Sequence, residues 1–159
     1  MKNVIHAICL TLLIGSIAMA ADWPSFRNDL QNSGNSTETG LLQSWPEGGP
    51  ELLWSIEGKF GLGWSSCAIV NDVVYTAGME EATRQGILYA ISSKGEILWQ
   101  KPYGPEWIKN FRGSRGTPTV VDGKIFIMTG NGLLTCFTTG GEQVWQVDVA
   151  KNYGIKAPM

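Results

Sequence analysis

The chain has 159 residues, of which 43% are hydrophobic and 16% charged, with seven tryptophans, 20 glycines and a formal net charge of −2 at pH 7. Nucleic-acid-binding proteins carry a strongly basic face and disordered chains have few apolar residues, so this composition excludes both classes. Few charges together with many glycines and tryptophans favour an aromatic-rich β protein with glycine turns.

The first 20 residues have the pattern of an export signal. Lys2 precedes a nearly continuous apolar run over residues 4–17, and Ala18-Met19-Ala20 supplies a small-x-small cleavage site, so the predicted mature chain begins at Ala21. A membrane anchor is the alternative, but the run is shorter than a span of ~20 residues and a polar segment follows it at once. We therefore predict an exported protein of the periplasm or cell surface, with no membrane span after cleavage.

Loss of the signal peptide removes His6, the single histidine. A chain without histidine cannot build a Ser-His-Asp or Cys-His site or a histidine-ligated metal centre, and no metal site is predicted. A site in which oxygen ligands hold a hard cation is still compatible with the sequence. Cys67 and Cys136 both lie in apolar strand-like runs, so we interpret them as buried small hydrophobic residues; one disulfide is the alternative in an exported chain.

A repeat follows the polar entry segment of residues 21–51. Residues 86–100 recur 46 positions later as residues 132–146, and the Gly-Glu and Trp-Gln pairs align without a gap. Residues 70–75 similarly resemble residues 121–126, and residues 52–55 form a third, partial copy. Internal repetition at this period is typical of solenoids and propellers.

Turn chemistry divides each repeat into four short strands. In the second repeat the expected strands are 117–121, 124–129, 133–137 and 143–147, with an Asp-Gly hairpin turn and two glycine-rich turns between them. Four antiparallel strands per ~45 residues is the pattern of a β-propeller blade. We therefore predict an all-β fold whose repeats span residues 52–159, with an outer strand at 52–56, complete blades at 57–100 and 101–149, and the start of a next blade at 150–159.

The repeat resembles the pyrroloquinoline-quinone (PQQ) type propeller repeat. The resemblance rests on Gly86-Ile87-Leu88-Tyr89-Ala90-Ile91 with the following Gly-Glu-Ile-Leu-Trp, on the opening Asp22-Trp23-Pro24-Ser25-Phe26-Arg27, and on Arg115-Gly116-Thr117-Pro118. That family includes exported quinoprotein alcohol dehydrogenases and the scaffold lipoprotein of the outer-membrane barrel-assembly machinery. Since propellers close with ~4–8 blades, the resemblance implies that this chain is the N-terminal part of a longer protein and needs further blades for closure.

Three tryptophans recur at one position of the outermost strand, namely Trp54, Trp99 and Trp145. Repetition in every unit favours a structural role, because catalytic residues are seldom repeated in this way. A large ring with a single N–H donor suits a half-buried joint, so these residues are predicted to dock one blade on the next.

Unrepeated residues between the blades are the candidates for ligand binding. The connection predicted at 101–116 carries Lys101, Lys109, Arg112 and Arg115 against one acid, Glu106. We predict that an anionic planar ligand is bound by Arg115, Arg112, Lys109, Trp107 and Trp64, with Arg115 facing the channel. A solvated basic loop whose aromatic rings cover the blade edges is the alternative.

Two functions follow. The first is an exported binding or scaffold platform for a protein or polymer partner, or for a small anionic ligand. The second, implied by the resemblance, is a quinoprotein dehydrogenase that oxidises alcohols or polyols with PQQ and Ca²⁺ as cofactors. The chain has no Cys-Cys pair, no matched calcium-ligand motif and no lipid-attachment cysteine. We assign no catalytic residue and expect no nucleic-acid partner.

Overall fold

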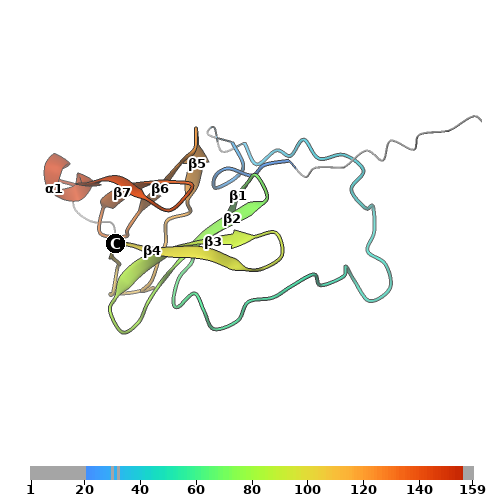
Figure 1. Cartoon of the computed structure of the whole chain (residues 1–159), viewed down its shortest axis with the longest axis horizontal. Helices are drawn as coiled ribbons and strands as arrows, with labels where there is room; N and C mark the ends of the chain where they lie inside the picture. Colours follow the sequence, from blue (N-terminus) through green and yellow to red (C-terminus); the bar gives the residue numbers. More distant parts are fainter. Residues whose placement is uncertain (1–20, 30, 32, 156–159) are drawn as a thin grey trace, which may run out of the picture.

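The computed structural model describes residues 21–29, 31 and 33–155, so the predicted signal peptide lies outside the described residues. Two four-stranded antiparallel sheets make up the fold (Figure 1). The first contains β1 (Ala68–Val70), β2 (Val73–Met79), β3 (Gln85–Ser92) and β4 (Ile97–Pro105), and the second contains β5 (Thr119–Val121), β6 (Lys124–Met128), β7 (Leu133–Thr138) and β8 (Gln143–Asp148). The predicted all-β fold of four-stranded antiparallel blades is confirmed.

Each sheet is a meander in which every strand pairs with its neighbours in sequence. The β1–β2 turn places Asn71 and Asp72 at φ 51° and 60°, and the β5–β6 turn places Asp122 and Gly123 at φ 48° and 70°. Two successive positive φ angles are the signature of a type I′ turn, whose twist matches that of the flanking strands. Asn, Asp and Gly tolerate this conformation best, which explains why these residues stand there.

The repeat extends to the irregularities of the sheets. The β3–β4 ladder shifts register between Ala90 and Ile91, and the β7–β8 ladder shifts at the corresponding step, between Cys136 and Phe137. As a result, Trp99 pairs with Ala90 and Trp145 pairs with Cys136. The two tryptophans therefore occupy equivalent positions on their sheets.

The core lies between the sheets. One side of the first sheet supplies Tyr75, Leu88 and Tyr103 to a buried cluster, and the second sheet supplies Ile125 and Phe137. Leu88, Tyr103 and Ile125 are completely buried. Burial of one such side chain stabilises the fold by ~1.5–3 kcal/mol, so this contact holds the two sheets together.

The start of the entry segment joins the inner strands of both sheets. Trp23 exchanges two backbone hydrogen bonds with Ile69, at 2.7 and 2.8 Å, and the Val120 amide donates to the Pro24 carbonyl at 2.8 Å. The rest of the segment, blue to green in Figure 1, runs wide of the sheets before it returns to β1. Several large apolar side chains are exposed along it, namely Leu41, Leu42, Trp45, Leu52 and Leu53.

Some expected boundaries differ from the structure. Residues 52–56 form no strand, because they pair with no other strand in the described part of the chain. The inter-blade connection begins later than predicted, since residues 101–105 belong to β4 and pair with β3. At 150–159, where a next blade was expected, the described residues begin with a short helix, α1 (Val149–Tyr153), capped by the Asp148 side chain.

The two cysteines have different environments. Cys136 is completely buried in β7, as predicted, whereas the prediction of burial is wrong for Cys67, which is exposed just before β1. The next residue, Ala68, is completely buried in the core, and side chains alternate between the two faces of a strand, so Cys67 lies on the exposed side together with Ile69. Both thiols are free.

Candidate functional site

The candidate site lies at one end of the sheets, which we call the loop end. It comprises the β2–β3 turn (residues 80–84), the β6–β7 turn (residues 129–132) and the connection between the sheets (residues 106–118). The Glu106 amide donates to the Arg84 carbonyl at 2.9 Å, and Asn131 Nδ2 donates to the Pro105 carbonyl at 3.0 Å. These two bonds fasten the connection to both turns.

A buried polar cluster underlies the loop end. Tyr103, Glu106 and Ser114 have exposed fractions of 0%, 2% and 0%. The Tyr103 hydroxyl donates to Glu106 Oε1 and lies 2.6 Å from Ser114 Oγ. Glu106 Oε2 accepts from the amides of Gly130, at 2.8 Å, and Trp107, at 3.3 Å. Both carboxylate oxygens are thus hydrogen-bonded, as a buried carboxylate requires.

Tyr103 also connects three strands. Its carbonyl in β4 accepts from Thr135 Oγ1 in β7 and from Gln146 Nε2 in β8, both at 3.0 Å. Burial, together with the adjacent Glu106 carboxylate, raises the pKa of the Tyr103 hydroxyl far above its usual range. The hydroxyl therefore stays protonated and remains a donor to Glu106. The cluster acts as a polar joint between the sheets.

The sequence analysis assigned no role to this cluster. Its signal was a break in the repeat: the positions 46 residues after Tyr103 and Glu106 hold Val149 and Asn152, so the second repeat has neither side chain. Gly86 carries a related signal. A Cβ there would lie 2.4 Å from Tyr103 Cζ, so the glycine makes room for the buried ring.

Three of the predicted ligand-binding residues lie together. Lys109 Nζ is 5.4 Å and Arg115 Cζ is 5.7 Å from the centroid of the Trp107 ring, which places both cations within reach of its π system. Trp107 Nε1 donates to the Asn110 carbonyl at 2.9 Å. The ring is therefore held in place by its own loop.

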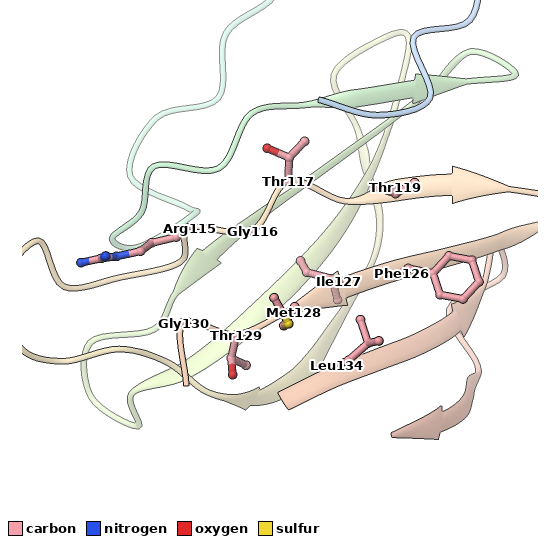
Figure 2. Close-up of a pocket in the computed structure, with 10 residues that line it drawn as sticks. All are labelled: Arg115, Gly116, Thr117, Thr119, Phe126, Ile127, Met128, Thr129, Gly130 and Leu134. Atoms are coloured by element: carbon pink, nitrogen blue, oxygen red, sulfur yellow. The ribbon is translucent and has the colours of Figure 1, made fainter. Parts of the chain in front are cut away.

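Arg115 makes several bonds within the connection. Its Nη2 donates to the carbonyls of Asn110, at 2.6 Å, and Phe111, at 2.9 Å. Phe111 has a φ of 49°, a left-handed conformation that the guanidinium helps to hold. Figure 2 shows the Arg115 side chain directed away from the apolar side chains of Phe126 and Leu134. Arg115 thus shapes the loop; its contact with a ligand stays a prediction.

The two other predicted residues lie on the flanks of the loop. Arg112 forms an ion pair with Glu81 at 3.2 Å, with both side chains about 60% exposed. An exposed pair of this kind contributes only ~0–1 kcal/mol, so Arg112 can turn to another anion at little cost. Trp64 is exposed, and its ring stands edge-on to Phe111 with centroids 6.3 Å apart.

The repeated tryptophans contact turns at the opposite end of the sheets. Trp54 Nε1 donates to the Ser93 carbonyl at 2.9 Å, and Trp99 Nε1 donates to the Thr139 carbonyl at 3.1 Å. Each ring also lies against a glycine of the same turn, two residues after the residue whose carbonyl accepts the hydrogen bond. These glycines are Gly95 and Gly141, whose added Cβ would come within 2.9 and 3.0 Å of the respective ring. Trp145 is 41% exposed.

Two cavities lie near the predicted ligand-binding residues. One of about 380 Å³ runs along the outer face of the second sheet, where it is lined by Arg115, Thr119, Phe126, Met128 and Leu134 among others (Figure 2). The other, of about 550 Å³, opens at the loop end between the β2–β3 turn and the connection. Only the second is bordered by the buried carboxylate.

The residues described here do not fit a PQQ–calcium site. They include no group of three or more His, Cys, Asp or Glu side chains placed to hold a metal ion. Glu106 directs one oxygen at Tyr103 and the other at two amides.

No family model matches the chain, and no curated protein matches it. Among solved structures the chain is similar to the quinohemoprotein alcohol dehydrogenase ADHIIG from Pseudomonas putida HK5, with 19% identity and a TM-score of 0.41. The match covers 54% of this chain and 13% of that enzyme. No helix in the described part of the chain is long and apolar enough to cross a membrane.

Proposed function

We propose that this chain is an exported propeller-repeat protein that acts as a binding or scaffold platform, with its loop end presented to an anionic partner. One observation carries the proposal: Glu106, the buried carboxylate of the site, is fully engaged in joining the two sheets. A carboxylate held by three donors acts as a structural acceptor. The residues that line the cavity beside it include two cations, Arg84 and Lys109, and the aromatic ring of Trp107.

The loop end is suited to binding because it is already ordered. The Trp107 ring and the Arg115 guanidinium are each fixed by loop carbonyls, and Glu106 fixes the start of the connection. A partner that binds such a surface does not have to order it first, which lowers the entropic cost of association. Exposed Arg112 adds positive charge at the rim.

Binding to a polyanion tests the platform proposal. The full chain should bind immobilised polyglutamate in biolayer interferometry, and the affinity should fall when salt is raised from about 50 to about 200 mM. Arg112→Gln should weaken binding by about threefold to tenfold, because one rim cation is lost. Lys94→Gln, in the β3–β4 turn at the opposite end, is the matched control and should leave binding unchanged. Equal loss in both variants, or no binding, contradicts the proposal.

Enzyme activity is the competing outcome. The same protein is titrated with PQQ and Ca²⁺ while reduction of a dye by alcohols is followed. We expect no turnover. Saturable PQQ binding with alcohol-dependent dye reduction would replace the platform proposal by the quinoprotein dehydrogenase that the sequence resemblance implies.

A further inference from the structure

The 550 Å³ cavity at the loop end has the size of a small-molecule site, within the ~300–1,000 Å³ typical of ligand pockets. Eight residues from three segments line it, namely Thr83, Arg84, Pro105, Glu106, Trp107, Ile108, Lys109 and Asn131. Apart from Trp107 and Lys109, none of them was singled out as ligand-binding by the sequence. The cavity is thus a distinct candidate within the loop end.

The walls of the cavity are fixed relative to one another. The Arg84 carbonyl accepts from the Glu106 amide, which joins the β2–β3 turn to the connection. Asn131 Nδ2 binds the Pro105 carbonyl, and Glu106 Oε2 accepts from the Gly130 amide, which join the β6–β7 turn to the same segment. A site built from three segments in this way is preorganised and does not depend on a single loop.

Two cations, Arg84 and Lys109, and one carboxylate, Glu106, line the cavity, which gives the lining a net charge of +1. Arg84 makes no side-chain hydrogen bond or ion pair with the described residues, and the Lys109 ammonium lies over the face of the Trp107 ring. The acids nearby are engaged: Glu81 pairs with Arg112, and Glu80 accepts from Thr83 Oγ1 at 2.5 Å. Glu106 is buried beneath the cavity with both oxygens bonded.

We infer that this cavity binds a small organic carboxylate with an apolar body, a conclusion that rests on the proposed binding function. The Arg84 guanidinium provides a planar fork that matches a carboxylate, and Lys109 adds a second cation. Trp107, Ile108 and Pro105 offer apolar surface to the body of the ligand. The carboxylate can belong to a free molecule or to the C-terminal residue of a peptide, because both present the same group.

Calorimetric titration of the full chain tests the inference. The probes are phenylacetate and benzoate, with phenylacetamide as a neutral analogue of nearly the same shape. Phenylacetate should bind saturably and about tenfold or more tightly than phenylacetamide, since hydrogen bonds from a guanidinium to a charged carboxylate are stronger than those to a neutral amide. Arg84→Gln and Lys109→Gln should each weaken phenylacetate binding to a similar extent. Acetyl-phenylalanine and its amide then distinguish a peptide C-terminus from a free acid.

Lys94→Gln is the matched control, since it removes one cation in the β3–β4 turn, outside the cavity. It should leave phenylacetate affinity unchanged, and circular dichroism should show that all three variants retain the wild-type spectrum. Equal affinity for acid and amide, an unchanged affinity in Arg84→Gln, or no saturation with either acid overturns the inference. Retained polyglutamate binding in that case would leave the platform function standing, so the two failures are distinguishable.

Discussion

The two sheets present the same face in two different environments. On the first sheet, Tyr75 and Trp99 lie with ring centroids 6.1 Å apart and planes tilted by 47°, and on the second, Phe126 and Trp145 lie 5.9 Å apart and tilted by 49°. The first pair packs into the core between the sheets. The second pair lies on a face that no further sheet covers in the described part of the chain, and Trp145 is 41% exposed.

This difference separates the features that arise within one sheet from those that depend on contact with a neighbouring sheet. Apart from an additional β3–β4 register shift between Gly86 and Ile87, the strand register, the bulge and the ring geometry are the same in both copies, so they arise within one sheet. Burial and the hydrogen bond of the tryptophan N–H are present only where a second sheet follows. Equivalent substitutions in the two sheets therefore measure the contact between sheets directly.

The largest expected effect comes from a pair of leucines at the same repeat position. Leu88 is completely buried between the sheets, whereas Leu134 lies on the uncovered face at the edge of a cavity. Leu88→Ala should lower the free energy of unfolding by ~2–5 kcal/mol, because it leaves a cavity in the core. Leu134→Ala should cost below about 1 kcal/mol. Urea unfolding of both variants checks this, and equal losses would show that the outer face is covered in solution.

The second test concerns a side chain without a counterpart in the second sheet. Tyr103→Phe removes the hydroxyl that binds Glu106 and Ser114 and leaves a buried carboxylate oxygen without its donor. The expected loss is ~1–3 kcal/mol in the free energy of unfolding. Tyr75→Phe is the control, because the second sheet already has Phe126 at that position, and should cost below about 0.5 kcal/mol. Similar losses in both variants would contradict the role of the Tyr103 hydroxyl in the polar joint between the sheets.

The repeat pattern predicted most of the sheet architecture. The observed starts of β6, β7 and β8, at Lys124, Leu133 and Gln143, are those expected, because type I′ and glycine turns mark them locally. The β4 extension to Pro105 was missed, since pairing with Gln85 is a property of the neighbouring strand. The helix α1 has no apolar periodicity that could reveal it, and none of its residues is buried.

The candidate site was predictable only in part. Trp107, Lys109 and Arg115, which the clustering of cations and aromatic residues singled out, lie in one region because they are close in sequence. Arg84 and Asn131 belong to turns of two different sheets, and only the fold places them beside that loop. Local spacing could not predict this proximity.

A third test isolates the contact between a tryptophan and its glycine. Gly141 has a φ of 86° and faces the Trp99 ring, whereas Gly123 has a φ of 70° and nothing within 4 Å of its added Cβ. Alanine at either position must adopt a left-handed backbone conformation, which costs ~1–2 kcal/mol of stability. At Gly141 the added methyl group also displaces the Trp99 ring. Gly141→Ala should therefore be less stable than Gly123→Ala by about 1 kcal/mol in urea unfolding. No difference would mean that the ring does not rest on the turn.

The smallest expected difference lies between the two tryptophans themselves. Trp99→Phe removes the N–H that donates to the Thr139 carbonyl and shortens a ring that bridges the sheets, so it should cost ~1 kcal/mol of unfolding free energy. Trp145→Phe removes an exposed ring edge and should cost below about 0.5 kcal/mol in the same measurement. The two losses become similar if another sheet covers Trp145, because its N–H would then also have a carbonyl partner to lose. Measuring the pair at increasing protein concentration separates the cases, since a cost at Trp145 that grows with concentration identifies a second copy of the chain as the cover.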